Sequence, residues 1–327
     1  MQWKPAYQVT VDGRDITSTL SPRLVSLTVD DAPGVQSDSV QLVIADHLPG
    51  QRVEIPPTGA EITVALGYGF LLKPMGVYIA DSVEVSGPPD QMTIRGTVAP
   101  HGRTSSGQQP LNDQKSRSWD AETTIGDLVR KVASEHGLRA VVSDALASIP
   151  LPHTDQVDES DINLLTRIAR DFDAIAKPGG GAMIFAKRGE IQMPRVSLTP
   201  QDVTSWRMSV KLKPPAEKVV ATYRDQPQAL DIEAVAGAGD VVRRLRQRFP
   251  TLASAKAAAD AEFNRSKRAG NQLSLTLPGN PDLVAEGRVS LSGFRDGLNG
   301  VWLVSKVQHQ IDKSGGYRCS VTAEPEA

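Results

Sequence analysis

The sequence lacks the features that mark several classes of protein. Cys319 is the single cysteine among 327 residues, which excludes an intramolecular disulfide and thiolate zinc sites. No window approaches the roughly 18 apolar residues of a membrane span, and the first residues hold no apolar segment of a signal peptide. We therefore expect a protein that is made and folded in the cytoplasm, without stable insertion into a membrane.

Aromatic residues and excess charge are also scarce. Aromatic side chains make up 5% of the sequence, so a core must be aliphatic, built from Val, Leu, Ile and Ala. The formal net charge of −2 provides no overall basic character, which argues against a general nucleic-acid binder. A locally polarised surface stays open.

Turn residues are plentiful, with 27 glycines and 23 prolines. Residues 1–100 alternate between apolar and polar in six short runs separated by Gly, Pro and Asp, which predicts an antiparallel barrel or sandwich. Residues 100–118 lose large apolar side chains, which indicates an exposed loop. Strand-like alternation returns after about residue 200, interrupted by an Ala-rich helix predicted over residues 251–267.

The middle of the chain shows helical periodicity. Apolar residues predict a helix over residues 124–136, followed by Gly137 as the C′ residue and Leu138 as its hydrophobic contact. A second amphipathic helix is predicted to run to Phe172, with Asp158 and Ser160 as candidate N-caps. The chain is thus predicted to be an α+β, mainly β protein. Two antiparallel β-barrel-like domains (residues 1–100 and 200–327) flank a linker and mixed helical domain (residues 101–199).

The histidines show no spacing typical of a metal or catalytic site. None falls in a His-x-x-x-His arrangement, and each is expected to have a structural role, as at the end of the helix over residues 124–136. The five are His47, His101, His136, His153 and His309. We predict no catalytic residue, no cofactor and no metal ligand.

An acidic cluster before the second helix is the best candidate for a carboxylate site, as a cation site or an acid/base pair. It consists of Asp155, Asp158, Glu159 and Asp161. It does not match an EF-hand loop, because no glycine occupies the turn position and no bidentate Glu follows at the last position. Helix capping and solvation explain it more simply, because negative charge is favourable near a helix N-terminus.

Three other motifs lack the context that chemistry requires. Gly67 and Gly69, and the glycines of residues 179–181, are predicted to form turns, because no strand-to-helix phosphate loop surrounds them. The pair Asp46 and His47 has no Gly-x-Ser-x-Gly elbow to complete a triad. The basic run of residues 243–248 could contact phosphates, but a solvated face or a subunit contact is the favoured interpretation.

Several stretches, taken in order, resemble the late control D family, the hub proteins of contractile phage tail baseplates. They include residues 15–17, 21–31 and 115–119, and the block of residues 287–293 with Gly300 to Val304 after it. The most specific is residues 156–170, Gln-Val-Asp-Glu-Ser-Asp-Ile-Asn-Leu-Leu-Thr-Arg-Ile-Ala-Arg. The resemblance covers nearly the whole chain.

The resemblance implies a homotrimeric hub similar to the hub portion of type VI secretion spike proteins. Two related β domains in each of three chains would form a pseudo-sixfold ring that adapts the tail tube to a threefold central spike. Implied partners are the tube protein, the spike protein, the tape-measure protein and other baseplate proteins, within a virion or a tail-like particle. No specific nucleic acid is expected, and a phage and an R-type pyocin would use the same hub.

Two other functions stay open from the sequence alone. A tail-tip peptidoglycan hydrolase would draw its carboxylates from Asp158, Glu159 and Asp161. A late-gene regulator would need a DNA-binding element, and neither the charge nor a helix-turn-helix pattern supports one. We therefore expect a structural protein and not an enzyme.

Overall fold

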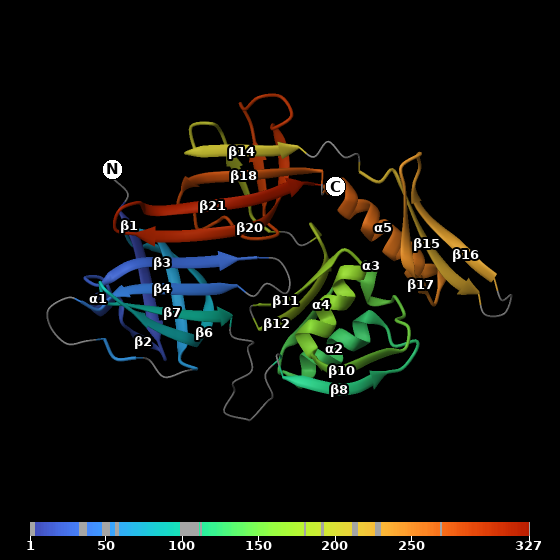
Figure 1. Cartoon of the computed structure of the whole chain (residues 1–327), viewed down its shortest axis with the longest axis horizontal. Helices are drawn as coiled ribbons and strands as arrows, with labels where there is room; N and C mark the ends of the chain where they lie inside the picture. The colour runs from blue at the N-terminus through green and yellow to red at the C-terminus, as the bar shows by residue number, and fades with distance from the viewer. Residues whose placement is uncertain are drawn as a thin grey trace. The chain divides into compact units, whose positions relative to one another are not determined.

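The computed structural model describes residues 4–32, 38–47, 53–55, 59–98, 111, 113–179, 181–190, 193–210, 215–225, 230–268 and 270–326. Within these residues the chain is mainly β, as predicted, with 21 strands and five helices (Figure 1). None of these helices is long and apolar enough to cross a membrane.

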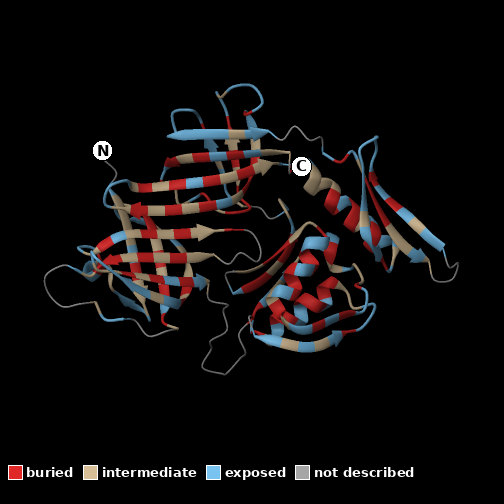
Figure 2. Ribbon diagram, viewed as in Figure 1, coloured by how far each residue is buried: buried red, intermediate tan, exposed pale blue. Residues whose placement is uncertain are grey.

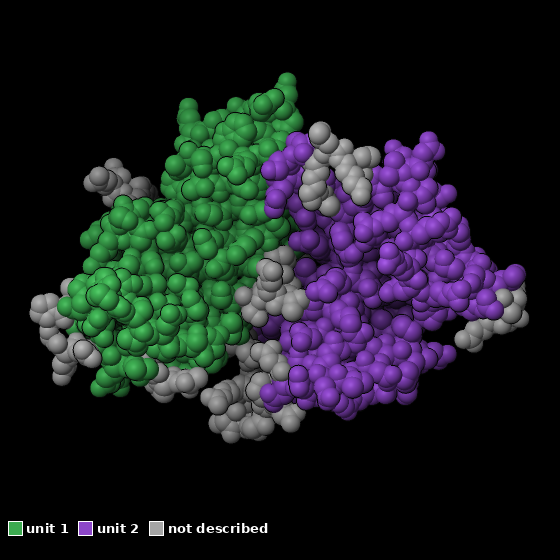
Figure 3. Space-filling view, viewed as in Figure 1, with its two compact units in different colours: residues 1–99, 193–208, 273–323 green, residues 100–192, 209–272, 324–327 purple. Residues whose placement is uncertain are grey.

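Two compact units divide the chain, and each is built from several segments (Figure 3). Unit 1 comprises residues 1–99, 193–208 and 273–323, and unit 2 comprises residues 100–192, 209–272 and 324–327. The region after residue 200, which the sequence assigns to a single third domain, therefore contributes to both units. The predicted domains and these units thus cut the chain at different places.

The first arm of unit 1 comes from the N-terminal residues, and its six main strands match the alternating runs of the sequence. Its elements are β1 Pro5–Val11, β2 Arg14–Asp15, α1 Thr17–Leu20, β3 Leu24–Asp31, β4 Ser39–Ala45, β5 Glu61–Tyr68, β6 Leu71–Ser86 and β7 Gln91–Val98. Position 67 of β5 requires glycine, because the Cβ of any other residue would lie 1.9 Å from the carbonyl oxygen of Leu71.

The second arm of unit 1 comes from the C-terminal part of the chain. Its strands are β13 Arg195–Leu198, β14 Ser205–Val210, β18 Asn271–Pro278, β19 Arg288–Leu291, β20 Gly300–Asp312 and β21 Gly316–Pro325. A sheet of 13 strands contains both arms, in the order β14-β18-β21-β20-β3-β4-β7-β6-β5-β1-β2, with β19 and β13 branching from β20.

The expectation that each arm closes into its own β-barrel is wrong, because the two arms share one sheet. Strand β3 of the first arm pairs antiparallel with β20 of the second, from Asp31 opposite Val307 to Ser26 opposite Asp312. The edge that would close each arm on itself is therefore used to join the two arms. Among the described residues the result is one open sheet with two ends, and no closed barrel.

A continuous, mainly aliphatic core packs against this sheet. Strands of both arms alternate between buried and less buried residues, which Figure 2 shows as bands along the arrows. Leu27 and Val29 of β3 pack in the same cluster as Val307 and Ile311 of β20. The low aromatic content of the sequence thus agrees with a core built mainly of Leu, Val and Ile.

The first half of unit 2 is a mixed α/β layer around two amphipathic helices. Its elements are β8 Gln114–Trp119, α2 Ile125–Glu135, β9 Arg139–Val142, α3 Asp144–Ala147, β10 Thr154–Ser160, α4 Asp161–Asp171, β11 Ala174–Gly179 and β12 Ala182–Lys187. Both predicted helices are confirmed. Gly137 has φ +67°, and Leu138 N donates to the carbonyl of Ala133 at 2.8 Å, so the predicted C-cap is also present.

The second half of unit 2 is a three-stranded sheet covered on one face by a helix. The elements are β15 Lys218–Asp225, β16 Leu230–Gly237, β17 Val242–Phe249 and α5 Leu252–Arg268, in the sheet order β16-β15-β17. Small residues such as Ala255 and Ala259 of α5 pack on Val219 and Ala221 of β15. The basic run of residues 243–248 lies in β17. Its many arginines leave no regular alternation of apolar and polar residues by which the sequence would predict a strand.

Candidate functional site

The most concentrated group of charged side chains inside the described structure surrounds Asp161. This residue starts α4 and its side chain is completely buried. Ser160 is the N-cap, with its Oγ accepting a hydrogen bond from the Asn163 N–H at 3.4 Å. Of the two candidate caps, Ser160 is therefore confirmed and Asp158 is wrong.

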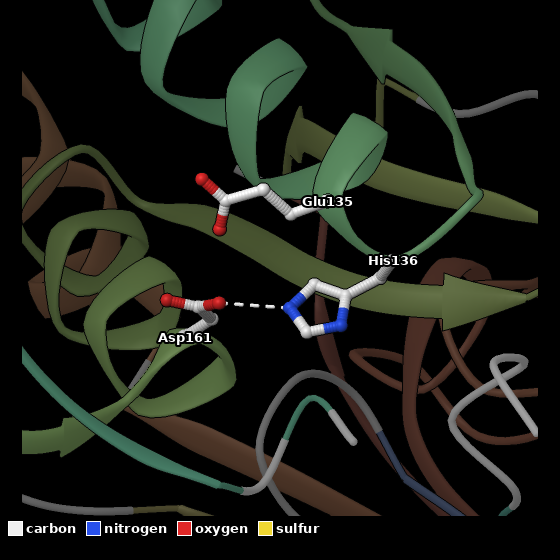
Figure 4. Close-up of side chains that lie close together, drawn as sticks. All are labelled: Glu135, His136 and Asp161. Atoms are coloured by element: carbon white, nitrogen blue, oxygen red, sulfur yellow. Dashed lines mark hydrogen bonds and ion pairs between the residues drawn. The ribbon is translucent and has the colours of Figure 1, made fainter. Parts of the chain in front are cut away.

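Four nitrogen donors from three different elements converge on the Asp161 carboxylate. Strand β8 provides Lys115 Nζ, 2.6 Å from Oδ2, and the Arg117 guanidinium, 2.7 Å from Oδ1. His136, just after α2, lies with Nε2 2.8 Å from Oδ2, and Gln156 of β10 donates from Nε2 to Oδ1 at 2.8 Å. Figure 4 shows the imidazole of His136 directed at the carboxylate. Each oxygen of Asp161 therefore has two partners.

A second carboxylate completes the group. Glu135, the last residue of α2, accepts a bidentate pair of hydrogen bonds from Arg117 at 2.7 and 2.9 Å and one from Lys115 at 3.1 Å. We call Lys115, Arg117, Glu135, His136, Gln156 and Asp161 the Asp161 cluster. Two cations and two carboxylates balance in it, as buried charges require.

The pairing of β8 with β10 explains how the donors reach Asp161. In this two-stranded sheet Arg117 is opposite Gln156, and Lys115 is opposite Glu159, with an irregularity between these pairs. Alternation along β8 then places Lys115, Arg117 and Trp119 on one face. The Arg117 guanidinium lies 4.4 Å from the centre of the Trp119 ring, which adds a cation–π contact.

The pKa values follow from this environment. Burial raises the pKa of Asp161, but hydrogen bonds from His136, Lys115 and Gln156 and the charge of Arg117 outweigh it, so the pKa lies well below its usual range. The same competition between burial and the two cations lowers the pKa of Glu135. Both carboxylates are thus ionised at neutral pH.

This geometry limits the chemistry that the cluster can carry. Ligand atoms of Glu135, His136 and Asp161 lie within 4.8 Å of one another, which is close enough for a metal ion. However, the ammonium of Lys115 and the guanidinium of Arg117 take the positions where a cation would bind. The His136 side chain is 2% exposed and that of Asp161 is 0% exposed, so a substrate has no direct access to either.

The other members of the predicted acidic cluster do not join Asp161. Asp155 is exposed and accepts from Ser118 Oγ at 2.6 Å. Asp158 accepts from Ser116 Oγ at 3.0 Å, and Glu159 forms an ion pair of 2.7 Å with Arg167. The four acids that are adjacent in sequence therefore point in different directions, and only Asp161 faces the interior.

A second buried polar group lies in the second arm of unit 1. His309 is fully buried, with Nδ1 2.9 Å from Tyr317 Oη and 3.2 Å from Cys319 Sγ, and Nε2 3.1 Å from the carbonyl of Leu283. Burial lowers the pKa of His309 to about 4 and raises the pKa of Cys319 to about 11. A neutral imidazole beside a protonated thiol is the opposite of the ion pair that activates a cysteine nucleophile.

The remaining histidines lie at the surface or outside the described residues. His47 is exposed, with Nδ1 3.1 Å from the carbonyl of Asp90. His153 is an exposed partner of Asp155, 3.2 Å away. His101 falls outside the described residues, as does part of the glycine turn at residues 179–181.

The sequence does not predict the contact between His136 and Asp161. No sequence pattern relates the end of the helix before His136 to the start of the helix at Asp161.

Comparisons with known proteins relate this chain to phage tails. A family model described as phage tail baseplate hub (GPD) matches residues 111–315, a range that includes the whole Asp161 cluster. The probable baseplate hub protein of Escherichia phage 186 is 31% identical over 361 aligned positions, covering 95% of this chain and 90% of that protein.

Solved structures share the fold at low sequence identity. The 43 kDa tail protein of prophage MuSo2 from Shewanella oneidensis matches with a TM-score of 0.73 and 15% identity, over 98% of each chain. The c3393 protein of E. coli, a component of a type VI secretion system, matches with a TM-score of 0.58 and 11% identity, over 99% of this chain and 77% of that one.

The fold is thus shared with solved tail proteins of phage origin. By the family model and the related phage protein, the chain belongs to the phage tail baseplate hub (GPD) family, the late control D family that the sequence resembles.

Proposed function

We propose that the chain is the structural hub of a contractile tail baseplate, a homotrimeric adaptor between the tail tube and the central spike. The observation that carries the proposal is the relationship to a probable baseplate hub protein over nearly the full length of both chains. The hub would work mechanically, by matching two symmetries and transmitting force when the sheath contracts.

The arrangement of unit 1 supports a pseudo-sixfold ring. Each chain carries two β arms of similar extent, joined edge to edge through β3 and β20. Three chains would present six arms to a sixfold tube while keeping threefold symmetry for the spike. The tube protein, the spike protein, the tape-measure protein and other baseplate proteins are the proposed partners, in a virion or tail-like particle.

We further propose that the Asp161 cluster maintains the fold of unit 2 and has no catalytic, cofactor or metal role. Its carboxylates are saturated by protonated nitrogens, and Asp161 is shielded from solvent. The alternative of a tail-tip hydrolase predicts cleavage of purified cell wall by the intact chain. Absence of cleavage supports the structural role, whereas cleavage that is lost in an Asp158→Asn or Glu159→Gln variant that still folds contradicts it.

The hub role is tested by imaging. Electron microscopy of tail particles that carry a tagged copy of the chain should show a three-fold ring between tube and spike. A chain that stays monomeric at high concentration and never enters purified particles contradicts the proposal. A specific DNA complex at physiological salt would instead support gene regulation.

A further inference from the structure

We propose that neighbouring copies of the chain associate by pairing the acidic free edge of β6, in unit 1, with the basic free edge of β17, in unit 2 of the next copy. This inference rests on the proposed trimeric hub and names the strands of its subunit contact. It also assigns a role to the basic run of residues 243–248.

The acidic edge is the second half of β6. Residues Leu71 to Ile79 of this strand pair with β5, and Tyr78 to Ser86 pair with β7 on the other side. From Ser82 onward, the side away from β7 therefore has no partner strand among the described residues. Glu84 is exposed on this stretch, and Asp81 is exposed at the bulge just before it. Neither acid has an ion-pair partner among the described residues, and Val85 is 55% exposed.

The basic edge is β17. This strand pairs only with β15, in parallel, so its other side is an edge of the three-stranded sheet. Arg243, Arg244 and Arg248 contact acids of unit 2, whereas Arg246 has no ion-pair partner among the described residues. Val242 is 46% exposed at the start of the strand.

Charge decides which edges can meet. An unpaired strand edge is a template for another strand, and charged side chains on it prevent pairing with an edge of the same sign. Two β17 edges would oppose Arg246, which has no acid partner among the described residues, and three further arginines to the same residues of another copy, and two β6 edges would oppose Asp81 and Glu84 to their own copies. Like charges therefore repel when two copies of the same edge meet, whereas the β6 and β17 edges attract each other. This repulsion disfavours a symmetric dimer through either edge.

A contact between unlike edges is head-to-tail. Such a contact leaves one free edge of each kind on every copy, so it repeats until a ring closes. A pair of short strands buries less than the roughly 1,200 Å² of a stable interface, so we expect it to be one part of the subunit contact.

Charge reversal in the full-length chain tests the pairing. One variant carries Asp81→Lys with Glu84→Lys, and the other carries Arg244→Glu with Arg246→Glu. Each should weaken self-association at least about tenfold at about 50 mM salt, measured by analytical ultracentrifugation, and less at high salt. The chain with all four changes should recover association, because the charges are again opposite.

Matched controls carry the same charge changes elsewhere on the surface, Asp120→Lys with Asp296→Lys and Arg139→Glu with Arg295→Glu. These should leave association unchanged, and thermal melts check the fold of every variant. The pairing is overturned if the wild-type chain associates and both edge variants associate equally well, or if the fourfold variant does not recover.

Cross-linking gives a second readout that does not depend on tight association. A Glu84→Cys copy mixed with an Arg246→Cys copy should form a disulfide-linked dimer under copper-phenanthroline oxidation. Cys319 is buried and should not react. The pairing is overturned if the mixed copies form no linked dimer. It is also overturned if a chain that carries both substitutions forms the disulfide within itself. A wild-type chain that forms no oligomer and enters no particle instead refutes the proposed hub itself.

Discussion

At the scale of single residues, the buried carboxylate of Asp161 is the side chain whose environment is most constrained. Asp161→Asn removes the charge that compensates Lys115 and Arg117, and its amide cannot accept four hydrogen bonds. We expect a loss of about 3–5 kcal/mol in the free energy of unfolding, measured by urea titration. Exposed Asp155→Asn is the matched control, expected within about 1 kcal/mol of wild type. Equal effects would show that burial of the cluster does not matter.

His309 should make stability depend on pH. The unfolded histidine takes up a proton near its ordinary pKa of 6.5, but burial disfavours the charged form and lowers the pKa of the folded histidine to about 4. Between these values the unfolded state binds more protons, so stability falls as the pH falls from 6.5 to 4. The contribution is roughly 3 kcal/mol in total.

Comparison with a non-titrating variant isolates this effect from the many surface carboxylates. Urea titrations of the wild type and His309→Gln at several pH values should give a difference in unfolding free energy that narrows as the pH falls. A difference that is constant across this range would show that His309 does not carry the pH dependence.

At the scale of elements, the sequence predicted most helices and strands but not their partners. Helices α2 and α4 follow from apolar periodicity and local capping, which are properties of neighbouring residues. Strand β17 was missed because four of its eight residues are arginine, and β8 because its inward-facing residues are Lys115 and Arg117. The Asp161 cluster could not be predicted, since its members come from four elements and charged residues at a core position look like surface residues in sequence.

The start of α4 gives a prediction at this scale. Ser160→Ala removes the side-chain acceptor of the Asn163 N–H and should reduce the unfolding free energy by about 0.5–2 kcal/mol. Ser160→Thr keeps the hydroxyl and should recover most of the loss. If Ser160→Thr is as unstable as Ser160→Ala, packing of the buried Ser160 side chain is the more important effect.

At the scale of the whole molecule, two separate cores predict two unfolding transitions. Trp302 lies in the core of unit 1, and Trp119 lies in the core of unit 2, beside the Asp161 cluster. In a Trp119→Phe variant, fluorescence should therefore report unit 1, and in a chain with Trp3, Trp206 and Trp302 all replaced by Phe it should report unit 2. Asp161→Asn should lower the urea midpoint of the unit 2 signal more than that of the unit 1 signal. Coincident shifts of both would indicate a single cooperative molecule.

The order of elements along the chain explains why the barrels were wrongly predicted. Alternation identified strands in two regions of similar style, and local turns suggested that each region closed on itself. The pairing of β3 with β20 joins residues from opposite ends of the chain, and no local pattern encodes a partner so distant.

That same pairing has a consequence for how the protein is made. During synthesis, β3 leaves the ribosome long before residues 307–312 are made. The edge of β3 that later pairs with β20 is therefore unpaired while the rest of the chain is synthesised. Contacts between distant segments form slowly, and open edges invite aggregation in the interval. Premature truncation anywhere before β20 should therefore yield insoluble chains, and a supply of the finished hub should depend on chaperones that shield β3 until the last strands arrive.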